Sequence, residues 1–386
     1  MALIDDTKAI LADLVAFPTV SADSNLELIA YAAERLSACD ASLHVMRDES
    51  GHKANLFATI GPQVDGGIVL SGHSDVVPAL AEEWQSDPFV LREADGRLYG
   101  RGTCDMKGFI AATLAMAPRY GKLGLKRPIH FAFTYDEEVG CLGAQHLIND
   151  LTSMGIKPSV AIIGEPTEMR IIEGHKGCFE YTTHFTGLEG HGSRPELGVN
   201  AVEYAVRYVT RMMQLAADVQ KMAPTDSRFE PPWTTVQVGQ ISGGMARNVI
   251  PGHCAVEWEM RPVSKRDADH VKSGLQTYCD EVLLPAMQHV SPEAGILTET
   301  IAEVAGLVPA DANEARAIVS ALTGQDDADL VAFGTEAGLF QSLGMSAVIC
   351  GPGSIAQAHK PDEFIAISGL QDCLDMLTGL EEKLLA

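Results

Sequence analysis

The stretch FAFTYDEEVG, residues 131–140, decides how this chain folds and where its chemistry lies. Its opening FAFTY is an apolar run typical of a buried strand. Asp136, Glu137 and Glu138 follow that run directly. Because adjacent carboxylates repel one another, a divalent metal would offset the repulsion, with one carboxylate as a ligand and its neighbour as a base. The stretch therefore predicts a strand with a metal-binding acidic end, and a solvated acidic turn is the alternative for any one of the three.

Outward from this stretch, strand-like and helix-like segments alternate through the first half of the chain. The helix-like segments are residues 10–15, 26–36, 108–117 and 143–151, and the strand-like segments are residues 54–60, 67–71, 129–134 and 160–163. The former have the spacing of amphipathic helices, and the latter are short continuous apolar runs. This alternation predicts an α/β fold, with a sheet covered by helices on both faces.

A different pattern begins at about Cys178. The segments there are a strand at residues 178–185, a helix at 200–217, strands at 234–241 and 253–261, a helix at 267–284 and a strand at 296–301. This β-α-β-β-α-β order is that of a ferredoxin-like unit. The α/β pattern then returns, with a helix at 314–322, a strand at 347–350 and a helix at 368–386. We therefore predict a ferredoxin-like α+β domain at residues 178–303, inserted into an α/β domain of residues 1–177 and 304–386.

The composition is that of a folded, acidic protein. Lys and Arg total 28 against 52 Asp and Glu, so the formal net charge is 28 − 52 = −24. Because a surface this negative repels phosphate backbones and anionic lipid, we expect neither a nucleic-acid partner nor a membrane partner. The eight cysteines include no C-x-x-C pair, which argues against a thiolate zinc site. The N-terminal segment lacks the pattern of a signal peptide, so we expect a cytoplasmic protein with free cysteines.

Two further clusters contain residue types that bind metals. In LSGHSDVVP, residues 70–78, His73 and Asp75 follow an apolar strand, and a carboxylate there can hold the second ring nitrogen of an imidazole ligand. In YGRGTCDMKG, residues 99–108, Asp105 precedes a helix-like segment. Taken singly, the first cluster is more often a hydrogen-bonded turn, and Asp105 is equally well explained as a helix N-cap.

Two more segments complete the set. Glu165 in IIGEPT comes directly after a strand, and His359 follows a Gly-rich turn in GPGSIAQAHKPDE. A single histidine in such a turn is more often structural than a ligand. Together, however, the five clusters supply His, Asp or Glu mostly at strand ends, and the sequence has no G-x-S-x-G, P-loop or dinucleotide-binding motif. The combination fits a mixed His/carboxylate site for two zinc-like ions.

These motifs resemble those of the M20 family of metallopeptidases and deacylases. SGHSDVVP, GRGTCDMKG, TYDEEVG, GEPT and AHKPDE occur in the order and approximate spacing of that family over nearly the whole chain. The resemblance implies that Asp105 bridges two divalent metal ions. His73 and Glu165 would complete the ligands of one ion, and Glu138 and His359 those of the other. Zinc is the expected metal, with cobalt or manganese as alternatives for the same ligands.

The resemblance also implies the remaining catalytic roles. Glu137 would be the general base, and Asp75 would orient His73. The inserted domain would serve as a lid and a homodimerisation domain. Within it, His191 in GHGS matches the lid histidine of the family, which in dimeric members comes from the partner subunit and stabilises the oxyanion. An exposed loop histidine is the alternative for His191.

Within the family, the motifs are most similar to those of the acetylornithine deacetylase branch. The stretch GPGSIAQAHKPDEF and residues 333–337 carry this similarity, whereas the related succinyl-diaminopimelate desuccinylases typically have Arg-Arg-Gly in place of HKG at residues 175–177. The branch implies hydrolysis of N2-acetyl-L-ornithine to L-ornithine and acetate by a metal-bridging water that Glu137 activates. The alternatives are desuccinylation, the hydrolysis of another N-acyl amino acid or of a dipeptide, and a metal-binding homologue without catalysis.

Five residues are candidates for binding the substrate. Asn248 lies in GGMARNVIP, which is similar to the substrate-binding segment of the family, and Arg261 ends the following strand. An α-carboxylate suits Arg261 or Lys176, although Arg261 could do no more than end its strand. Thr335 and Glu336 belong to the branch motif. Glu336 is assigned to the ornithine ammonium, with a structural acid near the metals as the equal alternative.

Overall fold

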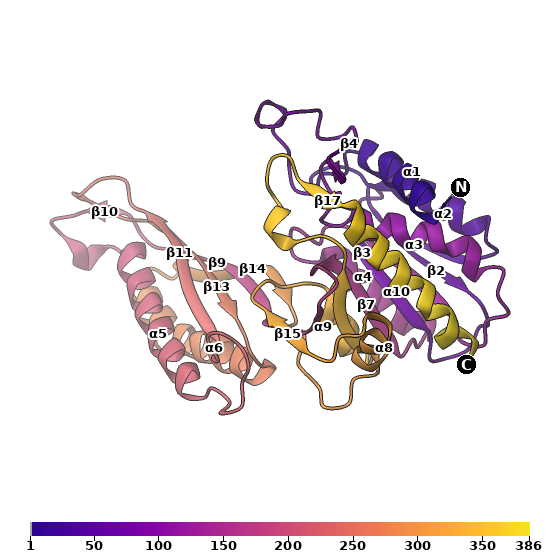
Figure 1. The fold of residues 1–386 in the computed structure, drawn as a ribbon. Helices are drawn as coiled ribbons and strands as arrows, with labels where there is room; N and C mark the ends of the chain where they lie inside the picture. Colours follow the sequence, from indigo (N-terminus) through magenta and orange to yellow (C-terminus); the bar gives the residue numbers. More distant parts are fainter. Residues whose placement is uncertain (1) are drawn as a thin grey trace. The chain divides into compact units, whose positions relative to one another are not determined.

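The computed structural model describes residues 2–386, which divide into two compact units (Figure 1). Unit 1 takes the chain up to Gly174 and then Pro309–Leu330 and Thr335–Ala386. Unit 2 comprises His175–Val308 and Val331–Gly334. Each unit has a hydrophobic core of its own.

Unit 1 is built around one eight-stranded sheet in the order β1-β2-β6-β3-β7-β16-β8-β15. The strands are β1 Ser42–Arg47, β2 Ala54–Ile60, β3 Ile68–His73, β6 Ile129–Thr134, β7 Val160–Pro166, β8 Ile171–His175, β15 Ala328–Val331 and β16 Ser346–Gly351. A small sheet in the order β17-β5-β4 joins β4 Arg92–Ala94, β5 Arg97–Tyr99 and β17 Phe364–Ala366. The four central strands of the large sheet, β6, β3, β7 and β16, are parallel.

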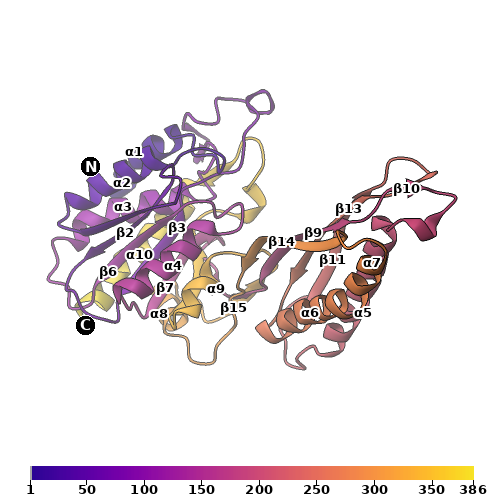
Figure 2. The ribbon, with the colours of Figure 1, turned by 180° about the vertical axis from the view of Figure 1, so that it is seen from behind.

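Helices cover both faces of the large sheet. They are α1 Leu3–Ala16, α2 Leu26–Ser37, α3 Lys107–Tyr120, α4 Leu142–Met154, α8 Glu314–Thr323, α9 Ala337–Ser342 and α10 Ile367–Leu385, with 3-10 turns at Ala81–Glu83 and Ile355–Gln357. Helices α1, α2 and α10 pack with α3 on one face, where α8 packs with α10, and α4 and α9 pack on the other face. Helix α10 lies in front of the sheet in Figure 1, and α4 lies in front of it in Figure 2. Because the central strands are buried on both faces, most of their residues are apolar rather than alternating with polar ones.

Unit 2 is an antiparallel sheet in the order β11-β13-β9-β14 with helices packed on it. Its elements are β9 Cys178–Thr186, β10 Gly190–His191, α5 Ala201–Lys221, β11 Thr235–Gly243, β12 Val249–Ile250, β13 His253–Arg261, α6 Lys265–Tyr278, α7 Leu284–Val290 and β14 Gly295–Val304, with a 3-10 turn at Pro195–Leu197 and a π-helical turn at Cys279–Leu283. Taken as β9-α5-β11-β13-α6-β14, the main elements have the ferredoxin-like order. The predicted fold class is therefore confirmed for both parts of the chain.

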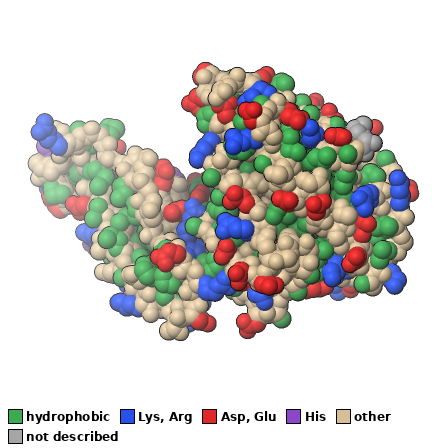
Figure 3. Space-filling model, in the orientation of Figure 1, with side chains coloured by type: hydrophobic (Ala, Val, Ile, Leu, Met, Phe, Trp, Pro, Cys, Tyr) green, Lys and Arg blue, Asp and Glu red, His purple; other side chains and the backbone are tan. Residues whose placement is uncertain are grey.

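Several elements differ from the sequence-based prediction. Strands β1, β8 and β15 and the small sheet were not predicted, since they are short or have mixed burial and depend on distant pairing. The helix expected at residues 267–284 begins at Lys265 and is interrupted by the π-helical turn. Among residues 2–386, no helix is long and apolar enough to cross a membrane. On the face shown in Figure 3, acidic and basic side chains are interspersed rather than gathered into one patch.

Candidate metal centre and active site

The candidate residues of unit 1 lie at the carboxyl ends of its parallel strands. His73 is the last residue of β3 and pairs in register with Thr134, the last residue of β6. The acidic triplet therefore begins two residues beyond the position opposite His73. Ser71 of β3 pairs with Ile163 of β7, which brings Glu165 to the same edge of the sheet. Three strands thus deliver an imidazole and several carboxylates to one place, as expected for ligand sites of parallel sheets.

Asp105 lies between the two candidate histidine ligands. Its Oδ1 is 2.9 Å from His73 Nε2, and its Oδ2 is 3.4 Å from His359 Nε2. Asp105 is buried in the loop before α3, and each of its carboxylate oxygens faces a different imidazole. This is the geometry that a carboxylate shared by two cations requires.

The other predicted ligands surround these three residues. Glu138 Oε2 is 3.0 Å from His359 Nε2, and Glu165 Oε1 is 3.8 Å from His73 Nε2. The side chains form two groups of three, and within each group the possible ligand atoms lie within 4.8 Å of one another. One group is His73, Glu137 and Glu165, and the other is His73, Asp105 and Glu138. Imidazole nitrogens and carboxylate oxygens are suitable donors for zinc and related divalent ions, so the residues present fit such ions.

The electrostatics of the cluster agree with a site for cations. Burial and the neighbouring acids Glu138 and Asp105 raise the pKa of Glu137 to about 8. Burial, followed by repulsion from Asp105, raises the pKa of Glu165 as well. The cluster thus holds more carboxylates than it can keep ionised at neutral pH without added positive charge. Divalent cations would supply that charge, and their binding would release the protons.

Asp75 makes hydrogen bonds with His73 and with the acidic triplet. His73 Nδ1 donates to the Asp75 carbonyl at 2.9 Å, which leaves Nε2 directed at Asp105. The Asp75 carboxylate accepts hydrogen bonds from the backbone N–H groups of Glu137 and Glu138, at 3.1 and 3.3 Å. Ser21 Oγ donates to the same carboxylate at 2.7 Å. Sequence reasoning missed Ser21, because no motif signals a hydroxyl that is 54 residues from its partner.

Thr335 and Glu336 are buried inside unit 1. Ser71 Oγ donates to one oxygen of Glu336, and Thr134 Oγ1 donates to the other at 2.8 Å. Thr335 Oγ1 accepts a hydrogen bond from the Ala337 N–H at 3.1 Å. Both Glu336 oxygens therefore accept hydrogen bonds from hydroxyl groups of β3 and β6. This favours a structural role for Glu336 over contact with a substrate ammonium.

In unit 2, His191 and Asn248 are neighbours. His191 pairs with Val249 in the short β10–β12 ribbon, and the Gly192 N–H donates to the Asn248 carbonyl at 2.8 Å. A Cβ at Gly192 would lie 2.9 Å from that carbonyl oxygen, so the close approach requires glycine. The His191 side chain is exposed, and its Nδ1 is 2.7 Å from Ser193 Oγ.

The two basic side chains of unit 2 that are candidates for binding the substrate, Lys176 and Arg261, already have protein partners. Lys176 Nζ donates to the Trp233 carbonyl at 2.7 Å, and Lys176 is buried. Arg261 Nη2 is 2.7 Å from Glu259 Oε2, and Glu180 is a second acidic neighbour at 3.9 Å. Residues 259 and 261 share one face of β13, so alternation along the strand would have signalled this pair.

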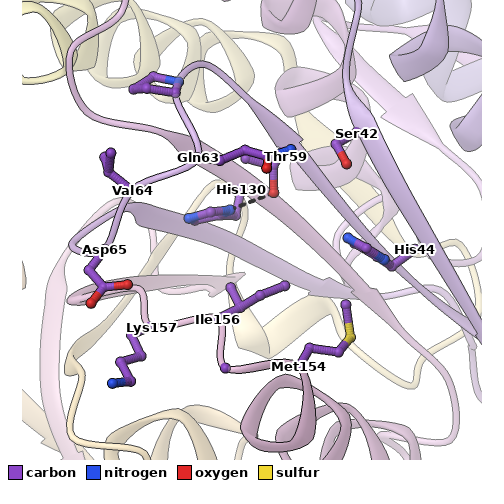
Figure 4. Close-up of a pocket in the computed structure, with 12 residues that line it drawn as sticks. Ser42, His44, Thr59, Gln63, Val64, Asp65, His130, Met154, Ile156 and Lys157 are labelled. Atoms are coloured by element: carbon purple, nitrogen blue, oxygen red, sulfur yellow. Dashed lines mark hydrogen bonds between the residues drawn. The ribbon is translucent and has the colours of Figure 1, made fainter.

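A cavity of about 360 Å³ lies elsewhere in unit 1 (Figure 4). It is lined in part by Thr59, His130, Asp65 and Lys157, and the Thr59 hydroxyl is 2.8 Å from His130 Nδ1. His130 is near the amino end of β6, opposite the end that carries the acidic triplet. None of the predicted site residues lines this cavity.

A family model described as peptidase family M20/M25/M40 matches residues 69–383. The chain belongs to this family. An acetylornithine deacetylase of Myxococcus xanthus is 37% identical over 377 residues, covering 95% of this chain and 94% of that protein. One from Pasteurella multocida is 34% identical over 374 residues, covering 95% of each. The comparisons identify the chain as a metal-dependent hydrolase of the M20 family.

Solved structures of the family share the fold. An M20 metallo-carboxypeptidase of Sulfolobus solfataricus superposes with a TM-score of 0.74 at 18% identity, covering 99% of each chain. A structure from Bacillus subtilis, described as a dinuclear metal-binding peptidase of the M20 family, has a TM-score of 0.62 at 15% identity, covering 100% of this chain and 99% of that one. At these identities the likeness concerns the fold alone.

Proposed function

We propose that this chain is an acetylornithine deacetylase, which hydrolyses N2-acetyl-L-ornithine to L-ornithine and acetate. The observation that carries the hydrolytic chemistry is Asp105, whose two oxygens face His73 and His359 in the same cluster as the acid Glu137. The substrate rests on the curated relatives, which are acetylornithine deacetylases at 33–37% identity.

Two divalent ions, zinc by preference, are the proposed cofactors. Asp105 would be shared, His73 and Glu165 would hold one ion, and Glu138 and His359 would hold the other. When bound, such ions polarise a carbonyl oxygen and lower the pKa of water toward 7. Cobalt or manganese suits the same donor set.

Glu137 is the proposed general base and acid. Its carboxylate lies within 4.8 Å of the ligand atoms of His73 and Glu165, and the Cys141 thiol donates to its Oε1 at 3.4 Å. Glu137 accepts a proton from the attacking water and then delivers it to the departing α-amine, so one group serves both transfers. Asp75 keeps the Glu137 backbone in place and orients His73 for the same reaction.

The inserted domain predicted at residues 178–303, which lies within unit 2, is proposed to act as the lid and the homodimerisation domain. His191 is assigned to the oxyanion of the tetrahedral intermediate, where a preorganised donor stabilises developing charge. Arg261, Lys176 and Asn248 are assigned to the substrate's polar groups. Their present partners, Glu259 for Arg261 and the Trp233 carbonyl for Lys176, hold these side chains in defined positions.

The test is release of free ornithine from N2-acetyl-L-ornithine by purified protein, before and after chelation and after addition of zinc, cobalt or manganese. We expect activity that chelation removes and added metal restores. A panel of succinyl-diaminopimelate, other N-acyl amino acids and dipeptides sets the substrate. Faster cleavage of any panel member than of acetylornithine would refute the substrate, and activity that survives complete metal removal would refute the metal centre.

A further inference from the structure

Glu363 contacts the loop that carries Asp105 through both of its carboxylate oxygens. Oε1 accepts from the backbone N–H groups of Cys104 and Asp105, at 2.8 and 3.1 Å. Oε2 accepts from the Gly102 N–H at 3.0 Å and from Arg101 Nη1 at 2.7 Å. The side chain is 1% exposed, so water does not compete for these bonds.

The arrangement leaves the loop little freedom. A buried backbone N–H without an acceptor destabilises the folded chain, and three such groups donate to this one carboxylate. The main chain adds a further link, because the Gly100 N–H donates to the Glu363 carbonyl at 3.0 Å. Any shift of the Asp105 backbone would therefore break several bonds at once.

The same residue also anchors the segment of the second histidine ligand. Glu363 is four positions after His359, whose side chain is 54% exposed and whose φ is +60°. Little packing holds His359 in place, and the nearby fixed point is the buried Glu363. Its carboxylate thus joins two segments that are more than 250 residues apart in sequence, each with a proposed ligand.

We propose that Glu363 is a positioning residue of the metal centre, which clamps the Asp105 loop to the His359 segment so that both ligands are set before metal binds. Without the clamp, metal binding must itself order the two segments, and that ordering lowers the affinity. The inference rests on the proposed metal centre. It predicts weaker metal binding with no direct effect on substrate binding.

The test is Glu363→Gln, which keeps the shape but turns an amide N–H₂ toward backbone N–H donors. We expect zinc affinity, measured by competition with a chromogenic chelator, to fall ten- to a hundredfold, in the range found for residues that orient metal ligands. Excess zinc should restore kcat, and KM at saturating zinc should equal that of the parent. Such rescue is the result that a merely structural role would not give.

Glu173→Gln is the matched control. Glu173 is also a buried glutamate of unit 1 paired with an arginine, Arg316, and it lies on β8, a strand that carries none of the proposed metal ligands. We expect a similar fall in thermal stability with zinc affinity unchanged. Equal affinity losses in both variants, or parent-like affinity in Glu363→Gln, would overturn the clamp.

Two further outcomes remain decisive. If Glu363→Gln does not fold, Glu363→Asp replaces it, because it keeps the charge on a side chain one methylene shorter. A smaller affinity loss in the same direction supports the clamp, and parent-like affinity overturns it. A parent protein that binds no zinc, cobalt or manganese would overturn the proposed metal centre and the clamp with it, whereas two bound ions with equal affinity in all variants would overturn the clamp alone.

Discussion

The two units hold their candidate residues in opposite ways. In unit 1 the proposed ligands Asp105 and Glu165 are buried, and both lie within 4 Å of His73. In unit 2 the proposed oxyanion donor His191 is exposed on a two-residue strand, with Ser193 as its nearest hydrogen-bond partner. Unit 1 therefore contains a preorganised cluster, and unit 2 offers single side chains on its surface.

This difference has a physical origin. Buried carboxylates that repel one another persist only when a rigid framework holds them, and the parallel edge of β3, β6 and β7 is such a framework. An exposed histidine needs no framework, because water solvates it. Changes in unit 1 should therefore act on the metal or on the chemical step, and changes in unit 2 should act on kcat or KM with the metal retained.

Glu137→Gln should have the largest effect. It removes the proton acceptor, so we expect kcat to fall at least a thousandfold, near the upper part of the usual range for general acid–base catalysis. Metal analysis of the same sample should still find two ions, since the variant keeps all five proposed ligands. The control Glu34→Gln changes an exposed glutamate of α2 and should leave both values unchanged. Full activity in Glu137→Gln would rule out the proposed mechanism.

His191→Ala should have the next largest effect. Loss of one oxyanion donor typically lowers kcat by about a hundred- to a thousandfold. Because His191 belongs to unit 2 and is exposed, zinc content and thermal stability should match the parent. His184→Ala, at another exposed histidine of unit 2, is the control and should retain its kcat. If both variants keep parent kcat, the oxyanion role assigned to His191 fails.

The same contrast explains which parts of the fold and of the candidate site could be predicted from the sequence. Asp136, Glu137 and Glu138 follow an unbroken apolar run, and such a run predicts both a buried strand and a shared edge with its parallel neighbours. Asp105 lies on a loop, where composition alone left an N-cap equally plausible, and only the family resemblance selected it. The central strands and the ferredoxin-like order were predicted because apolar periodicity is a local signal.

Contacts between distant segments could not be predicted in this way. Ser21 on Asp75 and Thr134 on Glu336 are ordinary hydroxyls whose roles depend on pairing across the sheet. Glu363 stands in the motif AHKPDE, yet nothing in the motif shows that its partners are backbone N–H groups of another loop. For Arg261 a local signal did exist, because Glu259 lies two positions earlier on the same face of its strand.

Arg261→Lys should have a moderate effect. Lysine replaces a planar, forked donor with a point charge, so it holds a carboxylate less firmly. We expect KM for acetylornithine to rise about tenfold, as for the loss of one good charge-assisted contact, with kcat and metal content nearly unchanged. The control is Arg207→Lys, at an exposed arginine of α5. An unchanged KM would leave Arg261 with its ion pairs to Glu259 and Glu180 as its only role.

The smallest effect is expected from His130→Gln, which tests whether acid sensitivity of unit 1 extends beyond the metal centre. Burial lowers the pKa of His130 to about 4, from an ordinary value near 6.5. The folded state therefore favours the neutral ring, and protonation of His130 destabilises the fold. The free energy of unfolding is unaffected by His130 above pH 6.5 and decreases as the pH falls toward 4. At pH 5.5 the loss is about 1 kcal/mol.

Glutamine does not titrate, so the melting temperature of chelated protein should fall less between pH 7 and 5.5 in the variant than in the parent. Equal drops would mean that the buried His130 does not contribute to acid unfolding, and the sensitivity would then lie with the carboxylate cluster.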